Sequence, residues 1–202
     1  MKLGIFGGTF SPPHKGHVNA AACFQKTFTL DKLLIVPAAL PPNKARDEIL
    51  SALHRTEMCK LAFADVPNCE VSDIELKRGG TSYTYLTLSE LSGPGVELYL
   101  LMGSDMFLTL GSWRKPEEIL RLATVVAAGR LNDPGDGEAM KRERDRLLAA
   151  YGGEIRFLDN PVTEISSTFL RDKIAAGEDT SEWLTGPIRR YIEEEKLYDV
   201  HR

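Results

Sequence analysis

The sequence predicts an α/β fold in which a parallel β-sheet is flanked by helices. Short apolar segments with strand character recur along the chain, and each is followed by a longer stretch with helical spacing. This alternation is typical of consecutive βαβ units. The 202 residues, 43% of them hydrophobic and 27% charged, suffice for one substantial core. We therefore expect a single domain over residues 1–202, with a C-terminal helical segment from about 165 to 202.

The apolar segments place the expected strands, and the stretches with an apolar repeat of three to four residues place the helices between them. In chain order, the expected strands are Lys2–Phe6, Lys32–Val36, Cys69–Leu76, Val96–Met102, Thr124–Ala128 and Glu154–Leu158. The expected helices are Gly16–Phe28, Ser51–Ala64, Tyr83–Leu91, Pro116–Leu122, Asp136–Tyr151, Ser167–Ala176 and Pro187–Glu195. The ends of these elements are defined to within about 2–4 residues.

The overall charge and the cysteine content exclude several classes of protein. A formal net charge of −4 argues against a chain whose main partner is a nucleic acid. Three cysteines without a C-x-x-C spacing indicate neither a disulfide framework nor a structural zinc site. The apolar runs are shorter than the roughly 18–20 residues of a membrane span, and the N-terminus lacks the order of a signal peptide. We therefore expect a cytoplasmic protein with no membrane partner.

The stretch "GIFGGTFSPPHKGHVNAA", which begins at Gly4, is the strongest candidate for a ligand site. It joins the first strand to the first helix, so it lies at the carboxyl edge of the predicted sheet, where open α/β folds bind ligands. Gly7 and Gly8 let a ligand approach the backbone, and the following helix offers unpaired N–H groups suited to phosphate. The stretch matches neither the dinucleotide-binding nor the P-loop glycine pattern. The sequence therefore predicts a phosphate site of another kind.

Two histidines, His14 and His17, follow the glycines at a spacing of three. Each imidazole can donate a hydrogen bond to phosphate oxygens, and charge developing on those oxygens strengthens such bonds. Zinc binding is the weaker interpretation, because His54 and His201 are distant and lack partners at ligand spacing. We expect no metal site built by the protein.

Two motifs resemble the signatures of the nucleotidylyltransferase superfamily. "GGTFSPPHKGH" is similar to its T/H-x-G-H signature, and "ISSTFLR", Ile165 to Arg171, is similar to its second signature. Read alone, "ISST" would be a Ser/Thr cap at the start of a helix. The two together imply a Rossmann-like fold and transfer of a nucleotidyl group from a nucleoside triphosphate.

Three further segments resemble the bacterial nicotinate-nucleotide adenylyltransferases within this superfamily. They are "PPNK" at Pro41–Lys44, "GGTSYTYLTLSEL" at Gly79–Leu91 and "LMGSDMFLTLGSWRKPEEIL" at Leu101–Leu120. The resemblance runs from Lys2 to about Lys173. It implies a reaction of ATP with nicotinate mononucleotide that gives nicotinate adenine dinucleotide and pyrophosphate, a step of NAD biosynthesis. Mg²⁺ would arrive with ATP, because no carboxylate cluster indicates a protein-built cage.

The resemblance also implies roles for individual residues. His17 would contact the α-phosphate, and His14 and Arg171 the remaining phosphates. The nucleotide would be held by Gly7, Gly8, Thr9, Phe10, Ser166, Ser167 and Thr168. The acceptor would be bound by Lys44, Thr81, Ser82, Tyr83, Thr84, Asp105 and Trp113, with the tryptophan stacked on its pyridine ring. Each of these residues also has a plainer interpretation. Trp113 could be partly buried packing, Asp105 and "TSYT" could cap helices, and Lys44 could be solvated.

Two positions depart from the family pattern, and several alternatives stay open. Ser11 stands where the family commonly has aspartate, and Asn43 where it has histidine. The acceptor could instead be nicotinamide mononucleotide or phosphopantetheine. A non-catalytic nucleotide sensor would retain the same fold, and a fragment related to class I aminoacyl-tRNA synthetases would share the histidine motif. The sequence leaves open whether the chain forms a homo-oligomer.

Overall fold

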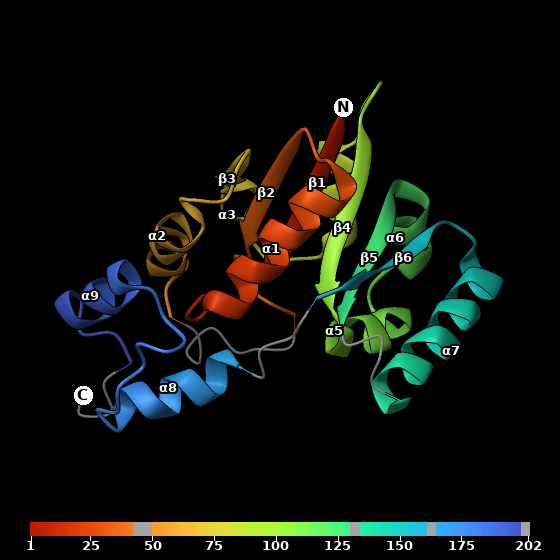
Figure 1. Ribbon diagram of the computed structural model, residues 1–202. Coiled ribbons are helices and arrows are strands. Elements are labelled where there is room, and N and C mark those ends of the chain that lie inside the picture. The colour runs from red at the N-terminus through yellow and green to blue at the C-terminus, as the bar shows by residue number, and fades with distance from the viewer. Residues whose placement is uncertain (43–49, 130–133, 161–164, 199–202) are drawn as a thin grey trace.

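A computed structural model of the chain describes residues 1–42, 50–129, 134–160 and 165–198. Its strands form one six-stranded sheet in the order β3-β2-β1-β4-β5-β6 (Figure 1). The strands are β1 Lys2–Gly8, β2 Lys32–Pro37, β3 Cys69–Val71, β4 Glu97–Gly103, β5 Ala123–Gly129 and β6 Ile155–Asp159. Every neighbouring pair runs parallel. The predicted parallel α/β fold is therefore confirmed.

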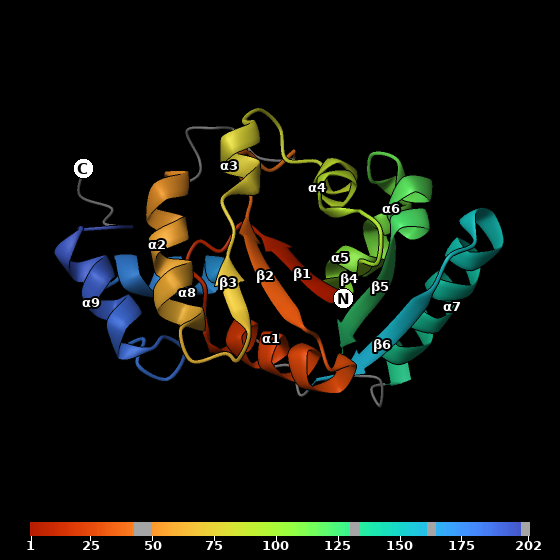
Figure 2. The ribbon, with the colours of Figure 1, turned by 90° about the horizontal axis from the view of Figure 1, so that it is seen from above.

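Helices connect the strands and cover both faces of the sheet (Figure 2). In chain order they are α1 Lys15–Phe28, α2 Ala52–Phe63, α3 Ile74–Arg78, α4 Thr84–Leu91, α5 Ser104–Thr109, the 3₁₀ turn η2 Leu110–Ser112, α6 Pro116–Leu122, α7 Pro134–Tyr151, α8 Ser167–Ala175 and α9 Gly186–Glu194. None of the helices among the described residues is long and apolar enough to cross a membrane.

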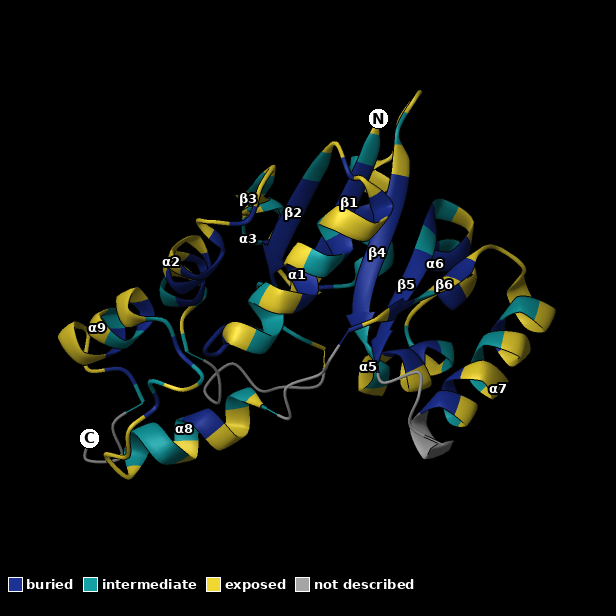
Figure 3. Ribbon diagram, viewed as in Figure 1, coloured by how far each residue is buried: buried dark blue, intermediate teal, exposed yellow. Residues whose placement is uncertain are grey.

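The central strands β1, β2, β4 and β5 are almost entirely apolar, because both faces of the sheet are covered there (Figure 3). Alternate residues of these central strands contribute to two separate cores; Leu33 and Ile35 of β2 belong to one, and Leu34 and Val36 to the other. The first core packs against α1, α2, α8 and α9, and the second against α4, α5, α6 and α7. The helices cover the two faces of the sheet, so the carboxyl ends of the strands remain accessible to a ligand.

The observed elements correct the sequence expectation in two places. The strand expected at Cys69–Leu76 ends at Val71, and Ile74–Arg78 forms the short helix α3 instead. The alternating pattern there suggested a strand, but β3 is an edge strand that pairs with β2 over only three residues. The helix α5 and the turn η2, which follow β4, were not predicted. The other expected strands and helices are confirmed, with ends shifted by no more than two residues.

The strand order reverses its direction of winding between β1 and β4. In an open parallel sheet the loops on either side of such a switch diverge and leave a crevice at the carboxyl ends of the strands. The β1–α1 loop, which carries both histidines, and the turn from β4 into α5 lie on the two sides of this crevice. The fold therefore places the stretch singled out by its sequence at the position where a ligand is expected.

Candidate active site

A cavity of about 1270 Å³ opens at the carboxyl ends of β1 and β4. It exceeds the roughly 300–1,000 Å³ typical of a site for one small molecule. Of the predicted site residues, those that line it are Gly7, Gly8, Thr9, Phe10, His14, His17, Ser82, Tyr83, Thr84, Asp105, Trp113, Ser167, Thr168 and Arg171. Thr81 and Ser166 are not among the lining residues, and Lys44, like Asn43, lies outside the described part of the chain. Most of the predicted set thus gathers around one cavity.

The two glycines at the end of β1 lie in different surroundings. A Cβ at Gly7 would meet no atom closer than the Val36 carbonyl oxygen, 3.9 Å away, so this position is open toward the cavity. A Cβ at Gly8 would lie 2.9 Å from the ring of Phe10. Phe10 is buried and packs edge-on against Phe6 and Phe63. Gly7 therefore leaves room for a ligand, whereas Gly8 leaves room for the aromatic cluster beneath the loop.

His14 and His17 lie face to face at the start of α1. Their ring centroids are 3.7 Å apart, and the rings are tilted by 34°. His14 occupies the N-cap position, and its backbone N–H donates a hydrogen bond to Nδ1 of His17 at 3.2 Å. Because Nδ1 of His17 accepts this hydrogen bond, the neutral imidazole carries its proton on Nε2.

Both imidazoles are held in the neutral form. Burial lowers the pKa of His14 from its ordinary value of 6.5 to about 4. Burial, and secondly the charge that His14 would carry, lower the pKa of His17 well below its ordinary value. Nδ1 of His14 has no hydrogen-bond partner among the described residues. The pair is therefore uncharged at neutral pH and offers neutral donors, which cost less to bury than two imidazolium ions.

The second motif touches the first directly, although 155 residues separate them. The hydroxyl of Ser167 donates to the carbonyl oxygen of Pro12 at 2.9 Å. Nη1 of Arg171 donates to the carbonyl oxygen of Ser11 at 2.8 Å, and Nη2 donates to Oγ1 of Thr168 at 3.1 Å. Oγ of Ser166 accepts from the backbone N–H of Phe169, so it caps α8. The helix α8 thus fixes the backbone just before His14.

The C-terminal segment holds the same loop through further contacts. The hydroxyls of Ser11 and Tyr198 share a hydrogen bond of 3.0 Å. The backbone N–H of Lys15 donates to the carbonyl oxygen of Trp183 at 2.9 Å, and its ammonium group donates to that of Ser181. Ser11, which replaces the aspartate of the family pattern, is therefore a buried anchor for the C-terminal segment.

Arg55 joins this loop to the next one, and nothing in the sequence pointed to it. The side chain lies in α2, is 1% exposed, and has no carboxylate partner in the described part of the chain. Its Nη1 donates to the carbonyl oxygen of Thr9 at 2.8 Å, and its Nη2 donates to that of Ala38 at 2.6 Å. Its Nε donates to the carbonyl oxygen of Leu50 at 2.9 Å. One buried guanidinium therefore ties the loop after β1 to the loop after β2.

The far end of the cavity is formed by α4 and by the segment after β4. The indole of Trp113 is half-buried, and its Nε1–H donates to Oγ1 of Thr109 at 3.2 Å. Asp105 lies exposed in the first turn of α5. Oγ of Ser82 accepts from the backbone N–H groups of Ala39 and Leu40, so this hydroxyl serves the loop after β2. A flat aromatic face and an exposed carboxylate thus line the same cavity as the histidines.

Sequence reasoning missed several residues that line the cavity. They include Glu75, Thr87, Arg114, Lys115 and Asn160. Thr87 donates to Glu75 at 2.6 Å, and α3, which carries Glu75, had been expected to be part of a strand. Arg114 and Lys115 directly follow Trp113 in "SWRKP", so proximity to the tryptophan was the one signal available for them.

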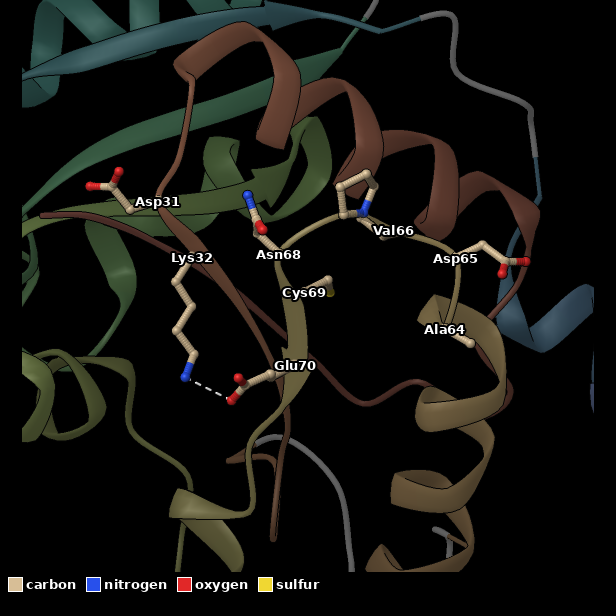
Figure 4. Close-up of a pocket in the computed structure, with 9 residues that line it drawn as sticks. Asp31, Lys32, Ala64, Asp65, Val66, Asn68, Cys69 and Glu70 are labelled. Atoms are coloured by element: carbon tan, nitrogen blue, oxygen red, sulfur yellow. Dashed lines mark ion pairs between the residues drawn. The ribbon is translucent and has the colours of Figure 1, made fainter.

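A smaller hollow of about 500 Å³ lies at the opposite edge of the sheet, at the amino ends of β2 and β3 (Figure 4). Lys32 and Glu70 form an ion pair of 2.7 Å there. It contains none of the predicted site residues. Within the described residues, no three His, Cys, Asp or Glu side chains gather closely enough to hold a metal ion.

Comparison with known proteins shows the family to which the chain belongs. The family model described as cytidylyltransferase-like matches residues 5–173. The chain belongs to this cytidylyltransferase-like family. The match begins inside β1 and ends within α8, so it includes both motifs that meet at the cavity.

Curated relatives of this family member cover its whole length. A probable nicotinate-nucleotide adenylyltransferase from a Thermoanaerobacter species is 36% identical over 98% of this chain and 94% of the relative. One of the same name from Oceanobacillus iheyensis is 35% identical over 100% of this chain and 98% of the relative. Among solved structures, Plasmodium falciparum nicotinic acid mononucleotide adenylyltransferase complexed with NaAD superimposes with a TM-score of 0.78 at 18% identity. It covers 98% of this chain and 97% of its own, and shows the same fold.

The buried neutral histidines predict a specific loss of stability in acid. Since the unfolded chain binds a proton to His14 near pH 6.5 and the folded chain only near pH 4, the unfolded state binds more protons between these values. The free energy of unfolding therefore falls as the pH is lowered through this window, by about 3 kcal/mol from this residue. His14→Asn removes that contribution. Urea unfolding of both proteins at pH 7.5, 6, 5 and 4 measures it, and parallel pH profiles would contradict the account.

Proposed function

We propose that this chain transfers the adenylyl group of ATP to nicotinate mononucleotide and releases pyrophosphate, in NAD biosynthesis. The observation that carries the proposal is the hydrogen-bonded junction of α8 with the β1–α1 loop beside the cavity. Arg171 and the two neutral histidines line the same cavity at the switch point of the sheet, which supports the proposal. We choose nicotinate mononucleotide as the acceptor because the curated relatives are named probable nicotinate-nucleotide adenylyltransferases.

The proposed reaction is a direct in-line attack by the phosphate of the mononucleotide on the α-phosphorus of ATP. Nε2–H of His17 donates to the α-phosphate, where negative charge builds up in the transition state. His14 and Arg171 contact the triphosphate, and the backbone from Gly7 to Phe10 holds the nucleotide. No side chain is needed as a nucleophile, because the work is alignment and stabilisation of charge.

The acceptor occupies the far end of the cavity in this proposal. Trp113 stacks on the pyridine ring, Asp105 accepts from ribose hydroxyls, and the start of α4 at Thr84 faces the substituent of the ring. The half-buried indole and the exposed carboxylate support this placement. Lys44, outside the described residues, is proposed to meet the phosphate of the acceptor.

Mg²⁺ enters as part of the ATP substrate in our proposal. The carboxylates among the described residues that line the cavity are Glu75 and Asp105, and Glu75 already accepts from Thr87 and lies 3.7 Å from Arg78. The chain thus supplies phosphate-binding cations and N–H groups, and the divalent ion neutralises charge on the phosphates it accompanies.

An assay of three acceptors tests the proposal. Purified protein with Mg-ATP receives nicotinate mononucleotide, nicotinamide mononucleotide or phosphopantetheine separately, and pyrophosphate is measured. We expect release with nicotinate mononucleotide at the highest kcat/KM. Preference for another acceptor would overturn the substrate and leave the reaction class standing. No release with any of them would indicate a nucleotide sensor.

Replacement of His17 tests the proposed contact with the α-phosphate. His17→Ala is expected to lower kcat at saturating ATP by about 10²-fold or more, since the lost bond acts mainly in the transition state. His54→Ala is the matched control, because His54 contacts Tyr191 at 2.9 Å and does not line the cavity. Turnover per folded molecule should be unchanged in the control. Near-normal kcat in His17→Ala would remove the role assigned to this residue.

A further inference from the structure

The hydrogen-bonded pairing of β1 with β2 ends just before the two loops that border the cavity. Its final bond runs from the backbone N–H of Ala38 to the carbonyl oxygen of Gly8 at 2.9 Å. Immediately beyond it, Nη1 and Nη2 of Arg55 donate to the carbonyl oxygens of Thr9 and Ala38. A longer bond of 3.4 Å joins Nη2 to the carbonyl oxygen of Ala39. Arg55 therefore continues the connection between the two loops where the sheet stops.

The buried guanidinium of Arg55 also has a third fixed point. Its Nε donates to the carbonyl oxygen of Leu50, next to the N-cap residue of α2. Because the donors of a guanidinium lie in one rigid plane, these bonds fix where the two loop carbonyls lie relative to each other. The ammonium group of a lysine is a single nitrogen on a flexible stem and imposes no such spacing. The arginine therefore acts as a rigid spacer between the loops.

The loop after β2 carries this constraint to another wall of the cavity. The backbone N–H of Ala39 donates to Oγ of Ser82 at 2.8 Å, and the backbone N–H of Ser82 donates to the carbonyl oxygen of Leu40 at 2.8 Å. The peptide group between Ala38 and Ala39 is thus held at both ends, its C=O by Arg55 and its N–H by Ser82. Ser82 lines the cavity two residues before α4. The start of α4 is therefore linked through Arg55 to the β1–α1 loop.

We infer that Arg55 sets the position of the two bound nucleotides relative to each other during the reaction. This inference rests on the proposed function and deepens it, because it assigns a positioning residue that does not itself line the cavity. In the proposed function the β1–α1 loop holds ATP, and the segment that begins at Ser82 holds the acceptor. In-line attack depends on the alignment of the two, and a displacement of about 1 Å costs about 10²-fold in rate. Each nucleotide by itself needs only its own side of the cavity.

The test compares Arg55→Lys with the control Met58→Ala. The lysine keeps a positive charge but lacks the planar donors that join the two carbonyl groups. Met58 is buried one turn further along α2 and does not line the cavity, so its truncation loosens the packing of the same helix. For each protein we measure thermal unfolding, the Kd of ATP and of nicotinate mononucleotide separately by calorimetry, and kcat at saturation with both.

A second variant, Ser82→Ala, breaks the same connection at its other end and leaves the buried guanidinium in place. It keeps the inference testable if Arg55→Lys does not fold. Its kcat and its Kd for ATP are measured in the same way, alone and combined with Arg55→Lys. Two substitutions that act through one connection are not additive, so the double variant should lose little more kcat than the weaker of the two single variants.

Arg55→Lys is expected to separate turnover from binding. Its kcat per folded molecule should fall about 10- to 100-fold, whereas each Kd should change by less than about threefold. Ser82→Ala should show the same loss of kcat with the Kd of ATP unchanged. Met58→Ala should unfold at a lower temperature and retain the kcat of the unaltered protein.

The outcomes separate this inference from the proposed function. A normal kcat in folded Arg55→Lys or in Ser82→Ala overturns the role of Arg55. A loss confined to the Kd of ATP also overturns it, because that indicates an effect of charge, and so does an equal loss of kcat in Met58→Ala. In these cases the unaltered protein still releases pyrophosphate, so the proposed function stands. Absence of release by the unaltered protein with every acceptor overturns the proposed function and this inference together.

Discussion

The buried guanidinium of Arg55 is the contact on which the geometry of the cavity depends. It takes the carbonyl oxygens of Thr9 and Ala38 as acceptors, so it fixes the loops after β1 and β2 relative to each other. A buried arginine without a carboxylate partner is stable only where several carbonyl groups solvate it. These bonds therefore impose one arrangement on two loops that would otherwise present their backbone to solvent independently.

The loop after β1, which Arg55 of α2 holds, is held as well by the C-terminal segment. Ser167 and Arg171 bond the carbonyl groups of Pro12 and Ser11, and Tyr198 bonds the side chain of Ser11. At the start of α1, a hydrogen bond to Nδ1 of His17 defines the tautomer of that residue, and burial lowers the pKa of both histidines so that the pair is neutral. A site assembled in this way is suited to hold phosphates in line, and the positioned N–H groups need no rearrangement when charge develops.

Local patterns predicted the parallel sheet and the position of the histidine loop, because both follow from apolar runs and from strand-to-helix order. The contact between "ISSTFLR" and the loop came from a resemblance of motifs; no spacing encodes a bond between Ser167 and Pro12. Arg55 was missed because an arginine in a helix is usually solvated, and its burial depends on carbonyl groups distant in sequence. The helix α3 was missed for a similar reason, since the end of the pairing with β2 at Val71 is set by the sheet edge. The roles of the site residues remain predictions.

The central claim is that the site works by alignment of two nucleotides, with no covalent intermediate on the protein. The stereochemical course at the α-phosphorus tests it most directly. ATP made chiral at that atom by sulfur substitution is converted with nicotinate mononucleotide, and the configuration of the product is determined by ³¹P NMR. A single in-line displacement predicts inversion of configuration. Retention would require two displacements, with an adenylylated side chain such as His17 between them, and would contradict the account.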